Sequence, residues 1–431
     1  MNTAVLRSAA RLAGLAGVAL LAEPLSGLAD TAAAGALGIS EQSALALGSG
    51  VVTTTTWLLA PLMFAQTTQI AQLRFSGDRA QVQAAVRRSV AIAAVWGLVL
   101  GCAVTVFALS TVSDGDSRAY MLARAAGLPV SAVVLAGYGA LRGIGRVFDV
   151  TALALGGATV HIGIVVVATH QGMGIVGIGT ASGLSQLAVA VVGVRILKRR
   201  GLLTVWTPSL RTGTDRSQSA LGAAGLLAVR SAMLGGATLV MTAAAVHSSA
   251  VDASAHLVVY QVWLLVVLTV EGWKSAAQIL VSSSQSVHER REVEKTVLIG
   301  SMWLGSASAV VVLAIGPWLT RLLSASADVQ TAAWSIWWLS ALSFVVGAVA
   351  FTRDGVEFGR GEFGANLVRI GIGSAITLAG AALTFVQRDL AWMWIGLSVG
   401  LLARALWPYR TPTEGREPEK SPLNEVSAGR R

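Results

Sequence analysis

The sequence predicts an all-α polytopic membrane protein, with twelve transmembrane helices arranged as two lobes of six. Of its 431 residues, 54% are hydrophobic and only 13% are charged, and the mean hydropathy is +0.67. A soluble domain of this length ordinarily carries about twice that share of charge. Apolar stretches of about 20 residues or more recur from end to end, and each is long enough to cross the hydrocarbon core of a bilayer.

Twelve apolar stretches define the predicted spans, which cover 11–37, 43–73, 86–112, 117–141, 149–170, 174–197, 219–246, 255–285, 295–320, 328–352, 363–387 and 390–408. The longest polar interruption follows the sixth span and divides the chain. The sequence therefore predicts an N-terminal lobe over 1–197, a cytoplasmic linker over 198–218, a C-terminal lobe over 219–408 and a disordered, charged tail over 409–431.

The basic residues lie mostly in alternate loops, on the side that also carries both ends of the chain. In the loops of the other side there are only Arg118, Arg321 and Arg388. This asymmetry follows the positive-inside rule, so we expect a multi-pass protein of the cell membrane with both termini in the cytoplasm. The net charge of +10 then reflects topology, and no nucleic-acid partner is predicted.

The sequence lacks the common motifs of enzymes and of metal sites. It contains no HExxH and no GxxxxGK followed by Ser or Thr, and its single cysteine, Cys102, excludes an intramolecular disulfide. We therefore expect a protein that is not an enzyme and that binds no metal or cofactor.

The two predicted lobes are similar to each other in sequence. Trp57 and Gln72 of the second span match Trp263 and Gln278 of the eighth at the same offset. Two six-span repeats of the same topology are related by an axis along the membrane normal, and transporters built in this way bind substrate between the repeats, near the bilayer midplane.

Four segments resemble the multidrug and toxic compound extrusion (MATE) family, and within it the DinF-like branch. They are Glu23-Pro24-Leu25 with Asp30-Thr31, then Leu141-Arg142-Gly143, then Gly174 to Gln186, and finally Val262 to Val281 with Asp354 to Phe363. The resemblance implies a V-shaped antiporter, a monomer in contact with membrane lipid. Such a protein exports cationic or amphipathic small molecules against a proton or sodium gradient.

Asp30 is the leading candidate for proton or ion coupling. A carboxylate deep in an apolar span is costly, and where one persists it usually handles an ion, a proton or a cationic ligand. Pro24 removes one backbone donor and is predicted to bend the helix there. Glu23 lies seven residues before Asp30 on the same helix face, so it either couples to Asp30 or caps a neighbouring helix.

The fifth span departs from the family pattern, which places an asparagine and an acid there. The matching stretch here, Thr159 to Val165, has no carboxylate, and His161 stands near the asparagine position. Histidine can change its charge near neutral pH. Three alternatives follow: Asp30 works with His161 and Ser182, the coupling has shifted elsewhere, or the coupling has been lost.

Further charged and polar residues are candidates for a cavity or gate. Glu271 and Lys274 share one helix face in the eighth span, as a self-neutralising pair or as cavity lining. Ser182 and Gln186 belong to the family-like sixth span. Arg142 is predicted to contact a gate or a lipid headgroup.

Asp354 and Glu357 form another pair three residues apart, flanked by Arg353 and Arg360. Their position near the cytoplasmic edge favours salt bridges of a gate or between the lobes over contact with substrate.

Two other functions stay open at this point. One is a flippase of the same superfamily that moves a lipid-linked intermediate. The other is a polytopic membrane enzyme, which would need a large loop outside the membrane with paired acids; the longest loop here is short and basic.

Overall fold

The computed structural model describes residues 3–75, 79–203 and 217–408. Most of the predicted linker and the whole predicted tail lie outside these residues. Within them, thirteen helices follow one another: α1 (Thr3–Leu20), α2 (Ala22–Leu37), α3 (Ile39–Phe75), α4 (Arg79–Thr111), α5 (Gly115–Gly143), α6 (Val147–His170), α7 (Gly174–Arg199), α8 (Ser217–Ser248), α9 (Ala250–Ser283), α10 (Val287–Leu323), α11 (Ala327–Arg360), α12 (Phe363–Gln387) and α13 (Ala391–Leu406).

The helices confirm the predicted all-α membrane architecture. Each of the twelve predicted spans meets a helix, and the first span is divided between α1 and α2. In the described part of the chain, ten helices are long and apolar enough to cross a bilayer on their own, namely α1 and α4 to α12. The short α13 and the threonine-rich α3 account for the other spans.

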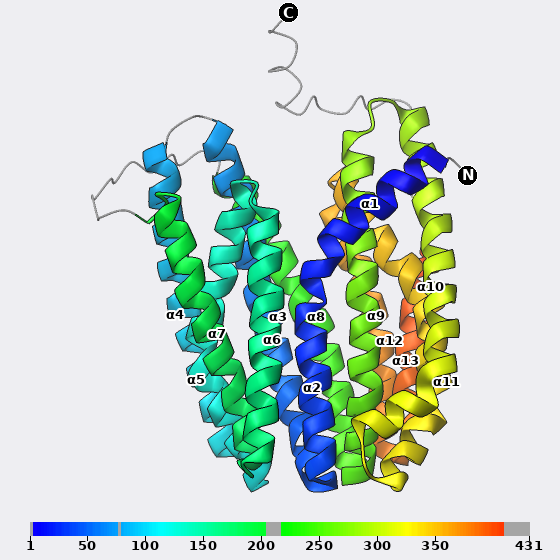
Figure 1. Cartoon of the computed structure of the whole chain (residues 1–431). Helices are drawn as coiled ribbons and strands as arrows, with labels where there is room; N and C mark the ends of the chain where they lie inside the picture. Colours follow the sequence, from blue (N-terminus) through cyan, green and yellow to red (C-terminus); the bar gives the residue numbers. More distant parts are fainter. Residues whose placement is uncertain (1–2, 76–78, 204–216, 409–431) are drawn as a thin grey trace, which may run out of the picture.

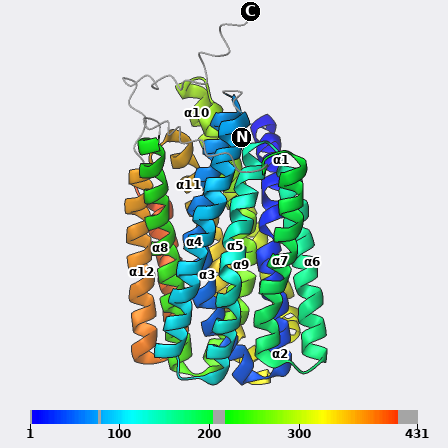
Figure 2. The ribbon, with the colours of Figure 1, turned by 90° about the vertical axis from the view of Figure 1, so that its left-hand side faces the viewer.

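The helices form two bundles that diverge toward one end. Figure 1 shows α4, α5, α6 and α7 gathered on the left and α9 to α13 on the right, while α2 and α8 lie between them. Seen from the side, the helices run roughly along one common axis (Figure 2). α8 joins the bundles because it packs against both α3 and α12, and Thr54 Oγ1 donates to the Gly235 carbonyl across α3 and α8 at 3.1 Å.

The first span bends between α1 and α2, at Leu21, three residues before Pro24. Because proline has no N–H, the first turn of α2 lacks one helical hydrogen bond. On the N-terminal side of the bend, α1 packs along α9 rather than beside the bundle of α4 to α7 (Figure 1). Gly17 and Gly272 allow this approach, since a Cβ on Gly272 would lie 3.0 Å from the Gly17 Cα. The sequence placed these residues in the N-terminal lobe and did not indicate this docking.

Hydrogen bonds join the two halves at the end of the molecule opposite the start of α1. Gln42, on the first turn of α3, is fully buried. Its Nε2 donates to the Leu323 carbonyl at 2.8 Å, and its Oε1 accepts from the Ser324 hydroxyl at 2.9 Å. Gly35 must be glycine here, because a Cβ would lie 2.3 Å from the Leu323 oxygen. The bundles are therefore closed at this end.

We expect Gln42→Leu to shift the protein toward a state that is open at this end. The two short hydrogen bonds contribute about 1 kcal/mol each, so their loss should raise the open population by roughly tenfold or more. The reporter is Ser254→Cys in a Cys102→Ser background, because Ser254 is fully buried at this end. Labelling of this cysteine by an impermeant maleimide should accelerate by the same factor.

Gln330→Leu is the matched control for this experiment. Gln330 Nε2 also donates to a backbone carbonyl of this region, that of Ser324 at 2.9 Å, but both residues belong to the second half. Labelling should therefore stay at the wild-type rate. Equal acceleration by both variants would show that Gln42 is not a link between the halves.

Candidate functional site

Asp30, His161 and Ser182 form a buried polar chain inside the first half of the molecule. They lie on α2, α6 and α7, respectively. His161 Nε2 is 2.7 Å from Asp30 Oδ1, and Ser182 Oγ is 3.4 Å from His161 Nδ1. Only 7% of Asp30 and 3% of His161 is exposed, so water contributes little to the solvation of either group. The three residues that the sequence grouped as one hypothesis thus meet in space.

Apolar side chains surround this polar chain. Ala34, Val165 and Ile178 lie one helical turn from Asp30, His161 and Ser182, and all three belong to one buried cluster. The cluster also includes Leu45, Ala46, Tyr120, Ile175, Ala181, Ala253 and Leu257. In such surroundings a charged carboxylate or imidazolium is stable only when it is paired and hydrogen-bonded. A change of charge on one partner must therefore disturb the packing of α2 against α6 and α7.

Glu23 does not join this chain. It lies two helical turns from Asp30, a rise of about 10 Å along the axis, and its side chain is exposed. It lies near Arg124 of the first half and Tyr260 of the second. On α7, the buried amide oxygen of Gln186 has no hydrogen-bond partner within the described residues.

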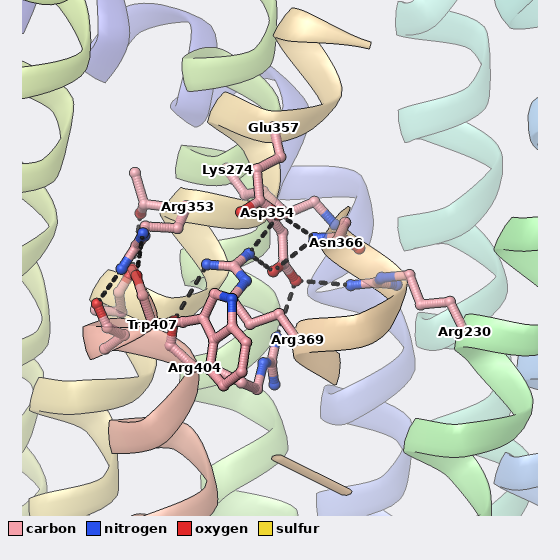
Figure 3. Close-up of polar contacts among 12 residues, drawn as sticks. Arg230, Lys274, Arg353, Asp354, Glu357, Asn366, Arg369, Arg404 and Trp407 are labelled. Carbon is pink, nitrogen blue, oxygen red and sulfur yellow. Dashed lines mark hydrogen bonds and ion pairs between the residues drawn. The ribbon is translucent and has the colours of Figure 1, made fainter. Parts of the chain in front are cut away.

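A second charged site lies in the other half and centres on Asp354 of α11 (Figure 3). The Asp354 side chain is 0% exposed. Among the described residues, four donors reach its two oxygens: Arg369 Nη2 at 2.6 Å and Asn366 Nδ2 at 3.0 Å on Oδ1, and Arg404 Nη2 at 2.9 Å and Arg230 Nη2 at 3.0 Å on Oδ2. These four hydrogen bonds occupy the acceptor capacity of a carboxylate, so Asp354 serves as a hub that ties α8, α12 and α13 to α11.

Glu357 lies one turn further along α11 and shares two of these donors. Its Oε2 accepts from Arg369 Nη2 at 2.8 Å and from Asn366 Nδ2 at 2.9 Å. The Lys274 ammonium donates to the Glu271 carboxylate on the same face of α9. Glu271 keeps 25% of its side chain exposed, whereas Lys274 keeps 7%.

The arginines that flank Asp354 and Glu357 each contact residues outside α11. Arg353 donates to the backbone carbonyls of Ala405 and Trp407 at the end of α13. Arg360 pairs with Glu294 of α10, at 2.7 Å from its Nε to Oε1. The contacts of Asp354 and Glu357 described above all lie within the second half, so they do not form salt bridges between the lobes in this state.

Arg142 lies in the last turn of α5, half-buried, with its Nη1 3.7 Å from Met63 Sδ. It belongs to the first half, away from the Asp354 hub. Leu141-Arg142-Gly143 and Arg353-Asp354-Gly355 nevertheless occupy matching places, because α5 and α11 are each the fourth span of their half.

Comparisons with known proteins agree with this architecture. No family model matches the chain. Protein DETOXIFICATION 44, chloroplastic, from Arabidopsis thaliana is 27% identical over 419 residues, covering 90% of this chain and 78% of the relative. Protein DETOXIFICATION 45, chloroplastic, from the same plant is 27% identical over 291 residues, and the match spans half of its length. An inward-facing structure of a multidrug resistance MATE family transporter of the MOP superfamily superposes with a TM-score of 0.76 at 16% identity, over 90% of this chain and 95% of that one.

Over most of its length the chain resembles the MATE family. The predictions of a multi-pass membrane transporter, and of a transporter rather than an enzyme, are confirmed by these relatives. The DinF-like branch stays a prediction, as do the roles of the individual site residues.

Proposed function

We propose that this protein is a secondary antiporter of the MATE family that exports amphipathic small molecules in exchange for protons. The Asp30–His161 pair is the observation that carries the proposal. It places a carboxylate and an imidazole at hydrogen-bond distance, 2.7 Å, in an apolar interior. The family pattern places an acid in this helix, and here an imidazole, which can donate or accept a proton, stands near that position.

The chemistry of the pair favours a proton over a sodium ion. Hard cations such as Ca²⁺ and Mg²⁺ take several oxygen ligands, and Na⁺ shares that preference. Here the nearest neighbour of the Asp30 carboxylate is an imidazole nitrogen. Among the described residues, no group of three or more His, Cys, Asp or Glu side chains is placed to hold a metal ion. A proton needs only the two atoms that are already in contact.

Ser182 can form a hydrogen bond with the His161 imidazole in both charge states of the ring. When the ring is neutral and Nε2–H donates to Asp30, the serine hydroxyl donates to Nδ1. When the ring is protonated, Nδ1–H donates and the hydroxyl oxygen accepts. Protonation of Asp30 instead removes the charge that holds His161⁺. The contact between α2 and α6 then weakens, and α2 is free to move about the bend at Leu21.

This state represents the inward-facing form in our proposal. The halves are joined at the Gln42 end, and the start of α1 lies at the diverging end (Figure 1). The positive-inside asymmetry of the loops supports a cytoplasmic location for that end and for both termini, in the cell membrane.

The test uses everted vesicles that contain the full chain, with proton and sodium gradients imposed separately. Three fluorescent probes serve as substrates: ethidium, rhodamine 6G and fluorescein. We expect a proton gradient alone to drive accumulation of at least one probe, and added probe to dissipate the pH gradient. Accumulation driven only by sodium would contradict proton coupling. Movement of a lipid-linked sugar without movement of any probe would favour the flippase alternative.

A further inference from the structure

The second half carries more positive charge than its own carboxylates neutralise. In the described part of the chain, the cluster around Asp354 combines four cations with three carboxylates: Arg230, Lys274, Arg369 and Arg404 with Glu271, Asp354 and Glu357. Arg353 is also near, but its guanidinium is directed to the end of α13. A surplus cation in a membrane interior is costly, and a bound anion would remove that cost.

Arg230 is the arginine at the open edge of this cluster. It reaches Asp354 from α8, the helix between the two halves (Figure 3). Its side chain is 14% exposed, whereas those of Arg369 and Arg404 are 1% and 3% exposed. Asp354 engages its Nη2, and its Nε has no hydrogen-bond partner within the described residues. A guanidinium of this kind can hold a second carboxylate through two parallel hydrogen bonds.

An aromatic ring lies beside Arg230 and Lys274. The Phe358 ring centroid is 5.6 Å from Arg230 Cζ and 5.5 Å from Lys274 Nζ. The ring is half-buried and packs against Phe363, with the two centroids 5.4 Å apart and the rings tilted by 30°. The edge of the cluster thus offers positive charge next to a flat apolar surface.

We propose that this edge, formed by Arg230, Lys274 and Phe358, binds the anionic end of the substrate. The substrate class is an organic anion with a carboxylate and an aromatic body. The carboxylate meets the Arg230 guanidinium, and the body lies against Phe358. This inference rests on the proposed antiport function and narrows its substrate, in place of the cationic compounds that the family resemblance implied.

The experiment uses the full chain in proteoliposomes with an imposed proton gradient. Two probes of matched shape are compared, 1-naphthoate and 1-naphthylmethylammonium, and binding of each is also measured by tryptophan fluorescence quenching. We expect transport and binding of naphthoate by the wild type. Arg230→Gln should weaken both transport and binding of naphthoate by about tenfold. Arg230→Lys keeps the positive charge but cannot form two parallel hydrogen bonds to a carboxylate, so its loss should lie between those of the wild type and Arg230→Gln. Arg321→Gln, at an exposed arginine in the last turn of α10, is the control and should behave as wild type.

The outcomes separate this inference from the proposed function. Transport of the ammonium probe without naphthoate would leave antiport standing and overturn the anion site. Naphthoate transport that is insensitive to Arg230→Gln would also overturn it. Binding of naphthoate that requires Arg230, without gradient-driven movement of either probe, would support the site and contradict antiport. A folding defect is recognised from the melting temperature in detergent, and Phe358→Leu then serves as the second variant, with the same loss of naphthoate binding expected.

Discussion

Asp30→Asn is expected to abolish gradient-driven export while leaving the protein folded. Asparagine has nearly the volume of aspartate, and its Oδ1 can accept the same hydrogen bond from His161 Nε2, now 2.7 Å long. It cannot take up a proton, so the change of charge that loosens α2 from α6 is lost. A neutral amide is also cheaper than a carboxylate in a membrane interior, by about 2 kcal/mol or more on insertion scales. Transport in everted vesicles should fall to background, and its pH dependence should disappear.

Two companion variants show whether Asp30 acts through the imidazole. His161→Gln should also abolish export, since the amide keeps a donor but does not titrate. Ser182→Ala should only weaken export. The Ser182 hydroxyl lies 3.4 Å from His161 Nδ1, so the substitution removes at most one hydrogen bond, worth about 1 kcal/mol. Wild-type export by Asp30→Asn, with unchanged pH response, would move coupling to the second half. Glu271 is then the better candidate there, because Asp354 already accepts four hydrogen bonds among the described residues.

The first half of the fold and its site were largely accessible from the sequence. Apolar length gave the spans, since a bilayer fixes how long each must be. The cost of a charge in hydrocarbon singled out Asp30, and the missing acid drew attention to His161. The sequence did not show which imidazole nitrogen faces the carboxylate, nor that Ser182 lies on the other side of the ring. Those contacts depend on the rotation of α6 and α7, which only packing determines.

The links between helices were harder to predict. Arg369, Arg404 and Asn366 come from two helices and meet Asp354 only in the folded chain. The sequence indicates that each isolated charge in a span needs a partner, but it does not indicate which residue that partner is. Gln42 was missed because one glutamine at a span boundary is unremarkable in sequence. The docking of α1 on α9 depends on the close approach of Gly17 and Gly272, in a chain with 47 glycines.

Asp354→Asn is expected to destabilise the second half severely. The three arginines would keep their charges while their shared counterion is gone, and the new amide NH₂ would face guanidinium donors. Removing one partner of a buried ion pair costs about 3–5 kcal/mol, and here one carboxylate serves Arg230, Arg369 and Arg404. Unfolding followed by tryptophan fluorescence in detergent should show this loss. Asp328→Asn, at an exposed acid near the start of the same helix, should stay within about 0.5 kcal/mol of wild type.

The double variant Asp354→Asn with Arg404→Gln shows whether orphaned charge causes the loss. Arg404→Gln alone removes one of the donors to Asp354 and should cost less than Asp354→Asn, because two arginines and Asn366 remain on the carboxylate. Added to Asp354→Asn, it removes one of the unpaired cations and should recover part of the stability, an interaction of about 0.5–3 kcal/mol between the two changes. Strictly additive costs would mean that Asp354 matters through its shape and packing. The arginines would then be held by their backbone contacts, such as Arg369 Nη1 to the Arg404 carbonyl at 3.2 Å, and not by the carboxylate.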